Sequence, residues 1–166
     1  MKRLLPVISL LFFFVFSAAF VAAQTSSGLL TKDEVKKVVP ASYFFRGQSA
    51  TVQQRNSAGF RVSGKYVLAG LVDTSGYSTD VQAKYIGFLI TEVRLNIGGH
   101  DLAPGEYGFG FKDGKFGVMD VASNELLSVD ARSDKDLKRP VPLTIESSEG
   151  GYKLYAGRQW VELKTE

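Results

Sequence analysis

Apolar and polar residues alternate along most of the chain after residue 48. Turn residues such as glycine, aspartate and proline interrupt this alternation about every ten positions. A period of two is typical of β-strands that bury one face, whereas an amphipathic helix repeats about every 3.6 residues. Examples are the segments 107–111, 115–121 and 141–146. The pattern predicts an all-β fold of about eight or nine strands, arranged as a single antiparallel β-sandwich or small barrel.

Turn sequences indicate how these strands are connected. Asp113-Gly114 lies between two alternating segments, and this pair suits a tight turn in which residues take positive φ. The segments 56–59 and 157–158 are expected to form two further hairpin turns. Two prolines occur at the start of the strand at 141–146. Because proline cannot donate to the hydrogen-bond ladder, this strand is expected at a sheet edge.

Two segments are apolar enough to lie inside a sheet. The segment 66–72 is apolar on both faces and is expected to be a buried central strand. The segment 85–97 is the longest strand candidate, and one of its faces carries Leu89, Val93, Leu95 and Ile97. Its other face becomes polar at Glu92 and Arg94, so this strand is expected to begin inside the sheet and to end near its rim.

One short helix is expected before the strands. Thr31 and Glu34 have the spacing of a capping box, in which each side chain accepts a hydrogen bond from the backbone of the other residue. Three valines follow on one side, and Pro40 ends the segment, so the helix is placed at 32–39. No helical period follows, and residues 31–166 are assigned to a single β-domain.

The N-terminal segment predicts an exported protein. Met1-Lys2-Arg3 is a basic start, residues 4–20 are almost wholly apolar, and small residues lead up to Ala23. These are the parts of a secretory signal peptide, so residues 1–23 are expected to be removed, which leaves 24–30 as a polar linker. The alternative is an uncleaved membrane anchor, because the apolar run approaches the roughly 20 residues that span a bilayer.

Composition narrows the class of partner. The chain has 20 basic and 17 acidic residues, and since Lys2 and Arg3 lie in the signal segment, the exported part keeps 18 and 17. This balance, and the lack of a basic cluster interleaved with aromatic residues, argue against nucleic acid as a partner. The chain has no cysteine, which excludes a disulfide framework and a thiolate nucleophile. We expect a secreted or periplasmic protein, most simply from a bacterium.

The glycine-rich segment 98–111 holds the only histidine, His100, beside Asp101. Adjacent residues in an extended loop do not easily face one another, and one histidine without cysteine makes a poor zinc site. Pro104-Gly105 predicts a type II turn with glycine at the positive-φ position. His100 is therefore expected in a loop before this turn, without a catalytic role. The bare glycines at 108 and 110 would let a neighbour approach the strand that follows.

Five residues of this segment form the pattern L-x-P-G-x-Y-x-F: Leu102, Pro104, Gly105, Tyr107 and Phe109. The pattern resembles the strand entry of transthyretin-like (carboxypeptidase regulatory-like) sandwich domains. The wider segment 98–120 is also similar to exported bacterial β-domains of unknown function. The resemblance implies a β-sandwich and assigns no catalytic residue.

Three acidic patterns have ordinary structural explanations. Residues 71–76 approach the aspartic-protease motif, but a serine separates Asp-Thr from the glycine, and no second copy is present. Asp130, Asp134 and Asp136 are interleaved with basic residues, which indicates a solvated loop and not a calcium site. A carboxylate pair for glycoside hydrolysis depends on a separation in space that sequence does not supply. No catalytic residue, metal ligand or cofactor is predicted.

Aromatic residues near the C-terminus are the remaining candidates for ligand binding. Alternation in the last hairpin places Tyr155 and Trp160 opposite the apolar side chains of that hairpin, where their rings would be partly exposed. A flat aromatic face with a polar neighbour suits a sugar, lipid or protein surface. The alternative is that these rings cover the open end of the sandwich.

These observations favour an exported, non-enzymatic β-domain that acts as a binding or structural module at the cell envelope. Its partner would be an envelope or extracellular protein, or a small apolar or sugar ligand. One alternative is a β-barrel carrier of a small apolar ligand, which would need an enclosed apolar cavity. The other is a hydrolase that uses a carboxylate pair or His100.

The predicted signal peptide can be tested directly. Expression in an exporting bacterial host should give a protein that begins at Gln24, because the peptidase needs the small residues Val21 and Ala23 before the cut. N-terminal sequencing and intact mass of the recovered protein measure this. Recovery of the whole precursor in the membrane fraction would instead identify the segment as an anchor.

Overall fold

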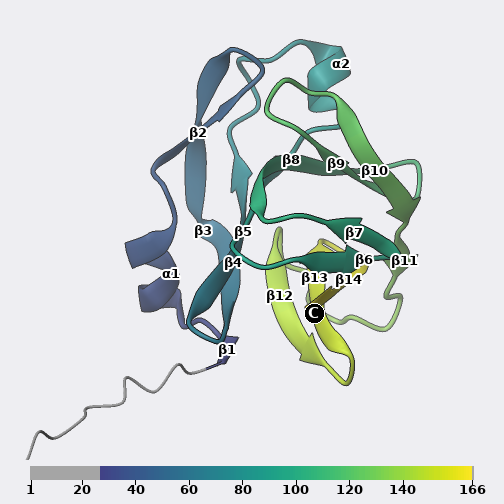
Figure 1. Cartoon of the computed structure of the whole chain (residues 1–166). Helices are drawn as coiled ribbons and strands as arrows, with labels where there is room; N and C mark the ends of the chain where they lie inside the picture. The colour runs from purple at the N-terminus through teal and green to yellow at the C-terminus, as the bar shows by residue number, and fades with distance from the viewer. Residues whose placement is uncertain (1–26, 166) are drawn as a thin grey trace, which may run out of the picture.

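The computed structural model describes residues 27–165, in which two antiparallel β-sheets pack face to face (Figure 1). The first sheet has the strand order β1-β3-β4-β5-β8-β9-β10, and β2 pairs with β3. Its strands are β1 (Gly28–Leu29), β2 (Ser42–Phe45), β3 (Gln48–Val62), β4 (Lys65–Val72), β5 (Gly87–Thr91), β8 (Gly105–Lys112), β9 (Lys115–Met119) and β10 (Glu125–Asp130).

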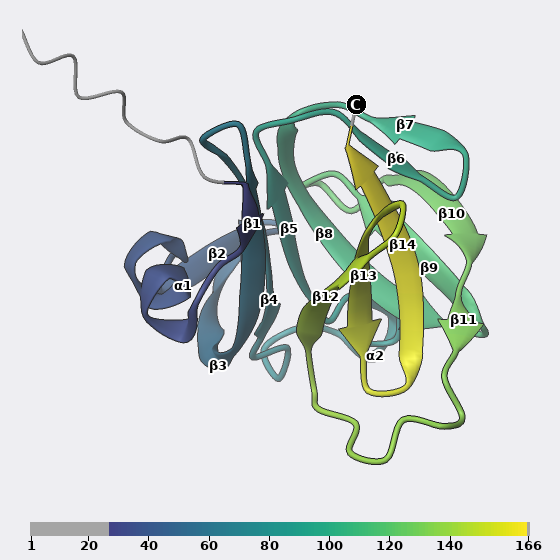
Figure 2. The same ribbon diagram turned by 90° about the horizontal axis from the view of Figure 1, so that it is seen from below.

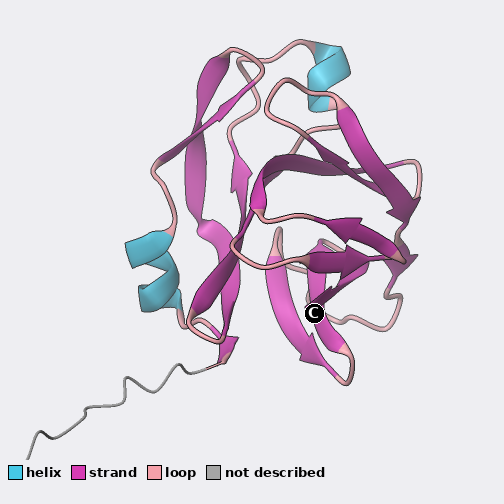
Figure 3. Ribbon diagram, viewed as in Figure 1, coloured by secondary structure: helices cyan, strands magenta, loops and turns pink. Residues whose placement is uncertain are grey.

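The second sheet has the order β12-β13-β14-β6-β7, and β11 pairs with β14. Its strands are β6 (Leu95–Ile97), β7 (His100–Leu102), β11 (Arg132–Ser133), β12 (Thr144–Ser148), β13 (Gly151–Ala156) and β14 (Gln159–Thr165). Two short helices complete the described chain: α1 (Lys32–Val38) and α2 (Thr79–Gln82), coloured cyan in Figure 3. The all-β sandwich predicted from the alternation is confirmed.

One apolar core fills the space between the sheets. Alternate residues of the first sheet, such as Phe60 and Phe109, point toward alternate residues of the second sheet, such as Leu154 and Leu163. All four side chains are fully buried. Phe60 also stacks on Tyr152 of the second sheet, with ring centroids 3.6 Å apart. The burial of these side chains supplies the main favourable free energy that holds the two sheets together.

A second core covers the other face of the first sheet. Figure 2 shows α1 and β2 on one side of β3 and β4, with β12, β13 and β14 on the opposite side. Val35 of α1, Phe45 of β2 and Tyr85 after α2 pack with Phe88 of β5 in this second core. The strand β4 is therefore buried on both faces, as its apolar sequence predicted.

The helix α1 occupies nearly all of the segment 32–39 in which the sequence predicts one. Thr31 Oγ1 accepts a hydrogen bond from the Glu34 backbone N–H at 3.3 Å, and the Glu34 carboxylate accepts one from the Thr31 N–H at 2.8 Å. This capping box satisfies two backbone donors that the first turn of a helix leaves free. The buried side chains Val35 and Val39 then fix the helix on the second core.

The prediction of one long strand over 85–97 is wrong, because the chain changes sheets inside it. β5 pairs with β4 and β8 in the first sheet, whereas β6 pairs with β14 and β7 in the second. Thr91 makes the bend: its buried hydroxyl donates to the Val93 carbonyl at 2.6 Å and accepts from the Val93 N–H at 3.2 Å. Glu92 and Arg94 are exposed at the bend, which explains the polar residues in this segment.

The segment 56–59 is not a hairpin turn, because β3 continues through it to Val62. Its register with β4 shifts between Val52 and Ser57, so the residues between them bulge out of the ladder. The Ser57 hydroxyl donates to the Gln53 carbonyl at 3.2 Å across this bulge. The turn into β4 lies instead at Ser63-Gly64, where both residues have positive φ.

Two smaller differences concern the ends of strands. Gly28–Leu29 pairs with β3, so part of the segment expected to be a linker belongs to the first sheet. The predicted signal peptide and residues 24–26 lie outside the described residues. Gly105 does not have positive φ and begins β8, packed against the Tyr107 ring, so the type II turn expected at Pro104-Gly105 is wrong.

Other predicted features are confirmed. Asp113 and Gly114 both have positive φ in the β8–β9 turn, and β12 lies at the edge of the second sheet. The bare glycines of β8 allow the expected close approach. A Cβ at Gly108 would overlap with the Phe45 ring, and one at Gly110 would overlap with the Lys84 carbonyl oxygen.

A pair of glycine substitutions tests this packing. Gly110 pairs with Gly117 across β8 and β9, but a Cβ at Gly117 would meet only the Glu125 carboxylate, at 3.9 Å. Gly110→Ala should lower the free energy of unfolding by about 2 kcal/mol, since backbone must move. Gly117→Ala should change it by less than about 0.5 kcal/mol. Urea unfolding measures both, and equal effects would contradict the close approach of Lys84.

Candidate binding surface

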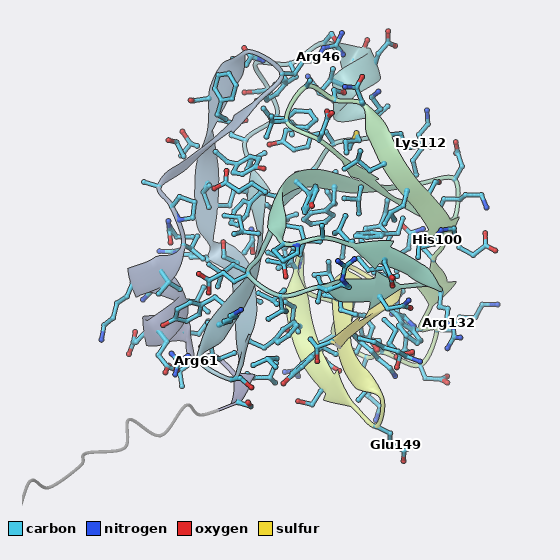
Figure 4. The ribbon with its side chains drawn as sticks, viewed as in Figure 1. Arg46, Arg61, His100, Lys112, Arg132 and Glu149 are labelled. Carbon is cyan, nitrogen blue, oxygen red and sulfur yellow. The ribbon has the colours of Figure 1, made fainter. Side chains whose placement is uncertain are left out.

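His100 and Asp101 do not form a catalytic pair. His100 is the first residue of β7, after the two-residue turn Gly98-Gly99, and it is exposed near the edge of the second sheet (Figure 4). Successive residues of a strand point to opposite faces. The Asp101 carboxylate instead accepts a hydrogen bond from the Asn96 side chain at 2.9 Å. The histidine thus lies in a hairpin, at the start of a strand and not in the loop that the sequence suggested.

The carboxylates singled out in the sequence have structural partners. Asp73 accepts the Ser75 N–H at 3.0 Å, and this hydrogen bond lowers the pKa of the Asp73 carboxyl. Asp130 accepts a hydrogen bond from Lys115 at 2.6 Å, which lowers the Asp130 pKa. Asp134 accepts the backbone N–H groups of Asp136 and Leu137 and so closes a turn. No group of three or more potential metal ligands occurs within residues 27–165.

The most strongly shifted titrating groups are tyrosines of the second core. Burial raises the pKa of Tyr43 and of Tyr85, and the nearby carboxylate of Glu106 adds to the shift at Tyr43. Tyr85 stacks on Phe45 with centroids 3.9 Å apart, and Tyr43 stacks on Phe88 at 5.3 Å. These rings fill the core, so the shifts report packing.

The outer face of the second sheet is different, because it carries an aromatic ring among charged groups. Trp160 alternates along β14 with the buried Val161 and Leu163, so it points away from the core. Its partners across the ladder are Tyr155 of β13 and Arg132 of β11. We call this surface the Trp160 face; it comprises Arg132, Lys153, Tyr155, Trp160, Glu162 and Lys164.

Two cations lie against the Trp160 ring. The Lys153 Nζ is 4.4 Å from the centroid of the ring, and the Arg132 Cζ is 5.1 Å from it. Neither cation has a carboxylate within ion-pairing distance among residues 27–165, whereas Lys164 pairs with Glu162 at 3.5 Å. The ring and the two cations therefore form a positively charged aromatic centre.

The structure places the two predicted binding residues side by side but exposes only one of them. Tyr155 and Trp160 have ring centroids 6.0 Å apart. Tyr155 is 3% exposed, and its burial, together with the carboxylates of Glu146 and Asp134, raises its pKa. Trp160 is partly exposed. Tyr155 thus supports the Trp160 ring from the side, and Trp160 is the residue that a ligand can reach.

Sequence reasoning missed both cations. Lys153 lies two positions before Tyr155, so the period of two that placed Tyr155 on this face would also have placed Lys153 there. Arg132 belongs to β11, which pairs with β14 although the two strands lie far apart in the sequence. Only the register between these strands brings Arg132 to Trp160.

Two hollows flank the ring on the surface of the sheet. One has a volume of about 360 Å³ and extends toward Gly98 and Lys164. The other has a volume of about 740 Å³ and extends toward Ser148 and Glu149, at the β12–β13 turn labelled in Figure 4. Both hollows are lined by Arg132, Trp160 and Glu162. The two hollows therefore adjoin each other at these three residues, and we call them together the groove of the Trp160 face.

A separate hollow of about 390 Å³ lies on the first sheet beside β8 and β9. Gly117, Met119, Lys84 and Lys112 are among its lining residues. It has no aromatic lining residue among the described residues. The Trp160 face is thus the stronger candidate for a binding surface.

Comparison with known proteins adds no relative: no family model, no curated protein and no solved structure matches this chain. Within residues 27–165, neither helix is long and apolar enough to cross a membrane.

The buried tyrosines predict a loss of stability in alkali. In the unfolded chain they ionise near pH 10, whereas in the fold Tyr43 and Tyr85 hold their protons to higher pH. Above about pH 10 the unfolded state binds fewer protons, so the free energy of unfolding falls as the pH rises. Urea unfolding between pH 8 and pH 11 measures this, and Tyr43→Phe with Tyr85→Phe should flatten the fall. An unchanged slope in the double variant would contradict it.

Proposed function

We propose that this chain is an exported, non-enzymatic binding module of the cell envelope, and that it holds its ligand on the Trp160 face. The observation that carries the proposal is the position of Trp160, which points outward into a groove and is flanked by Arg132 and Lys153. Tryptophan and arginine are the residues that most often dominate binding energy at interfaces. The signal-peptide pattern of residues 1–23 supports the export.

The carboxylates of the groove favour binding over hydrolysis. A glycosidase needs one carboxyl group with a raised pKa to act as general acid. Asp130, which lines one end of the groove, has its pKa lowered by Lys115. Glu162 is paired with Lys164 and accepts a hydrogen bond from the Ser148 hydroxyl at 3.3 Å. The lowered pKa of Asp130 does not suit a general acid, and Glu162 already has structural partners in Lys164 and Ser148.

The packing between the sheets favours surface binding over transport of an enclosed ligand. A carrier would need an apolar cavity inside the sandwich. In the described residues that space is occupied by the core, including Phe60, Phe109 and Leu154, all of them fully buried. The hollows that flank Trp160 lie on the outer surface and have charged walls.

Removal of the Trp160 ring tests the proposal. On centrifugation, the wild-type protein should sediment together with isolated cell envelopes of the exporting host. Trp160→Ala should weaken this binding at least about tenfold, as expected for a central aromatic contact. Phe44→Ala is the matched control, because Phe44 is 55% exposed on β2, away from the Trp160 face. The control should bind like the wild type.

Two outcomes would contradict the proposal. Failure of the wild-type protein to sediment with envelopes would remove the envelope role. Unchanged sedimentation of Trp160→Ala would move the binding surface elsewhere. Urea unfolding of each variant shows whether a loss reflects the ligand contact or the fold.

A further inference from the structure

We propose that the groove on the Trp160 face binds a linear polysaccharide that carries carboxylate groups, of the polyuronate type. This inference rests on the proposed function, because it names the ligand class of the same surface. It follows from three properties of the groove: its two-sided shape, its unpaired cations, and its hydrogen-bond acceptors.

The shape of the groove suits a chain that continues past the ring on both sides. The hollows of about 360 Å³ and 740 Å³ share Arg132, Trp160 and Glu162, so Trp160 lies between them. A compact ligand would use one hollow and leave the other empty. A polymer would place one unit at Trp160 and its neighbours in the two hollows.

The cations at the ring select a negatively charged group. Arg132 and Lys153 have no ion-paired carboxylate among the described residues and are held only against the Trp160 ring. Such cation–π contacts are weak at exposed sites, whereas a ligand carboxylate offers both cations charge-assisted hydrogen bonds. A ligand carboxylate can therefore draw both cations from the ring. The freed ring face then packs against the C–H groups of a sugar, as an amphipathic aromatic surface does.

The acidic residues of the groove explain why the ligand is a sugar and not simply a polyanion. Glu149 and Glu162 line the larger hollow together with Ser147 and Ser148. Carboxylates accept hydrogen bonds from hydroxyl groups, and they repel an anionic polymer whose units offer no hydroxyl group beside the charge. A uronic-acid polymer offers hydroxyl donors for the glutamates and carboxylates for Arg132 and Lys153. Both signs of charge in the groove are then used.

The single tryptophan of the chain provides a specific reporter. The sequence contains one tryptophan, so emission excited at a wavelength that tyrosine does not absorb reports on Trp160 alone. Titration of the wild-type protein with sodium polygalacturonate should change this emission. Half-saturation should require at least about tenfold less polymer than with the carboxyl-reduced, neutral form of the same polymer. Added salt should weaken binding, because the cations are near the surface.

Two variants and a matched control test the residues. Arg132→Gln and Lys153→Gln remove one positive charge each and should each weaken polygalacturonate binding about tenfold, as measured by calorimetry. Lys112→Gln removes an exposed lysine from the separate hollow on the first sheet and should leave binding unchanged. A loss in all three variants would indicate attraction by overall charge and would overturn the site.

The remaining outcomes separate this inference from the proposed function. Equal affinity for dextran sulfate would overturn the sugar-carboxylate class, and equal affinity for the neutral polymer would overturn the role of the cations. If no polymer binds but Trp160→Ala still loses envelope sedimentation, the ligand class is wrong and the binding surface stands. If no polymer binds and Trp160→Ala sediments with envelopes like the wild type, both the ligand class and the proposed function are wrong.

Discussion

Burial of the central strands of the first sheet on both faces is the constraint on which the rest of this structure depends. β4 and β5 face the second sheet on one side and α1, β2 and the segment around α2 on the other. Both faces of these strands therefore contact the two cores, which leaves few of their polar groups accessible to a ligand. The second sheet has one face in the core and one outside, so its outer face can carry charged and aromatic residues without loss of stability.

The bend at Thr91 links the two sheets and sets this division. The buried Thr91 hydroxyl holds the Val93 backbone, and the chain passes from β5 in the first sheet to β6 in the second. β6 then pairs with β14, the strand that carries Trp160. The central strand β5 is thus followed by the neighbour of the binding strand β14, and β11, which follows β10 of the first sheet, also pairs with β14.

Local patterns in the sequence predicted much of this fold. The Asp113-Gly114 turn, the double-sided burial of 66–72 and the edge position of the strand after the prolines each follow from chemistry within a few residues. The failures were nonlocal. Alternation is the same on both sides of Thr91, so it did not reveal the change of sheet, and the bulge before Ser57 looked like a turn because serine and asparagine favour turns.

The sequence predicted only part of the binding surface, because the remaining contacts join residues that are distant in the sequence. Alternation placed Trp160 outward, but Tyr155 is buried, and the Asp134 carboxylate near its hydroxyl comes from a distant part of the sequence. The approach of Arg132 depends on the pairing of β11 with β14. A cation and a ring that are distant in the sequence meet only through strand pairing, and a period-two pattern shows which face a side chain takes but not which strands pair.

The most direct test of the account is a nuclear magnetic resonance titration of the isotope-labelled protein with polygalacturonate oligosaccharides. Shifts are predicted for the Trp160 indole N–H and for backbone amides of β11, β13 and β14, with β3, β4 and β5 unchanged. Shifts centred on β8 to β10, or spread evenly through the first sheet, would contradict the claim that the outer face of the second sheet is the binding surface.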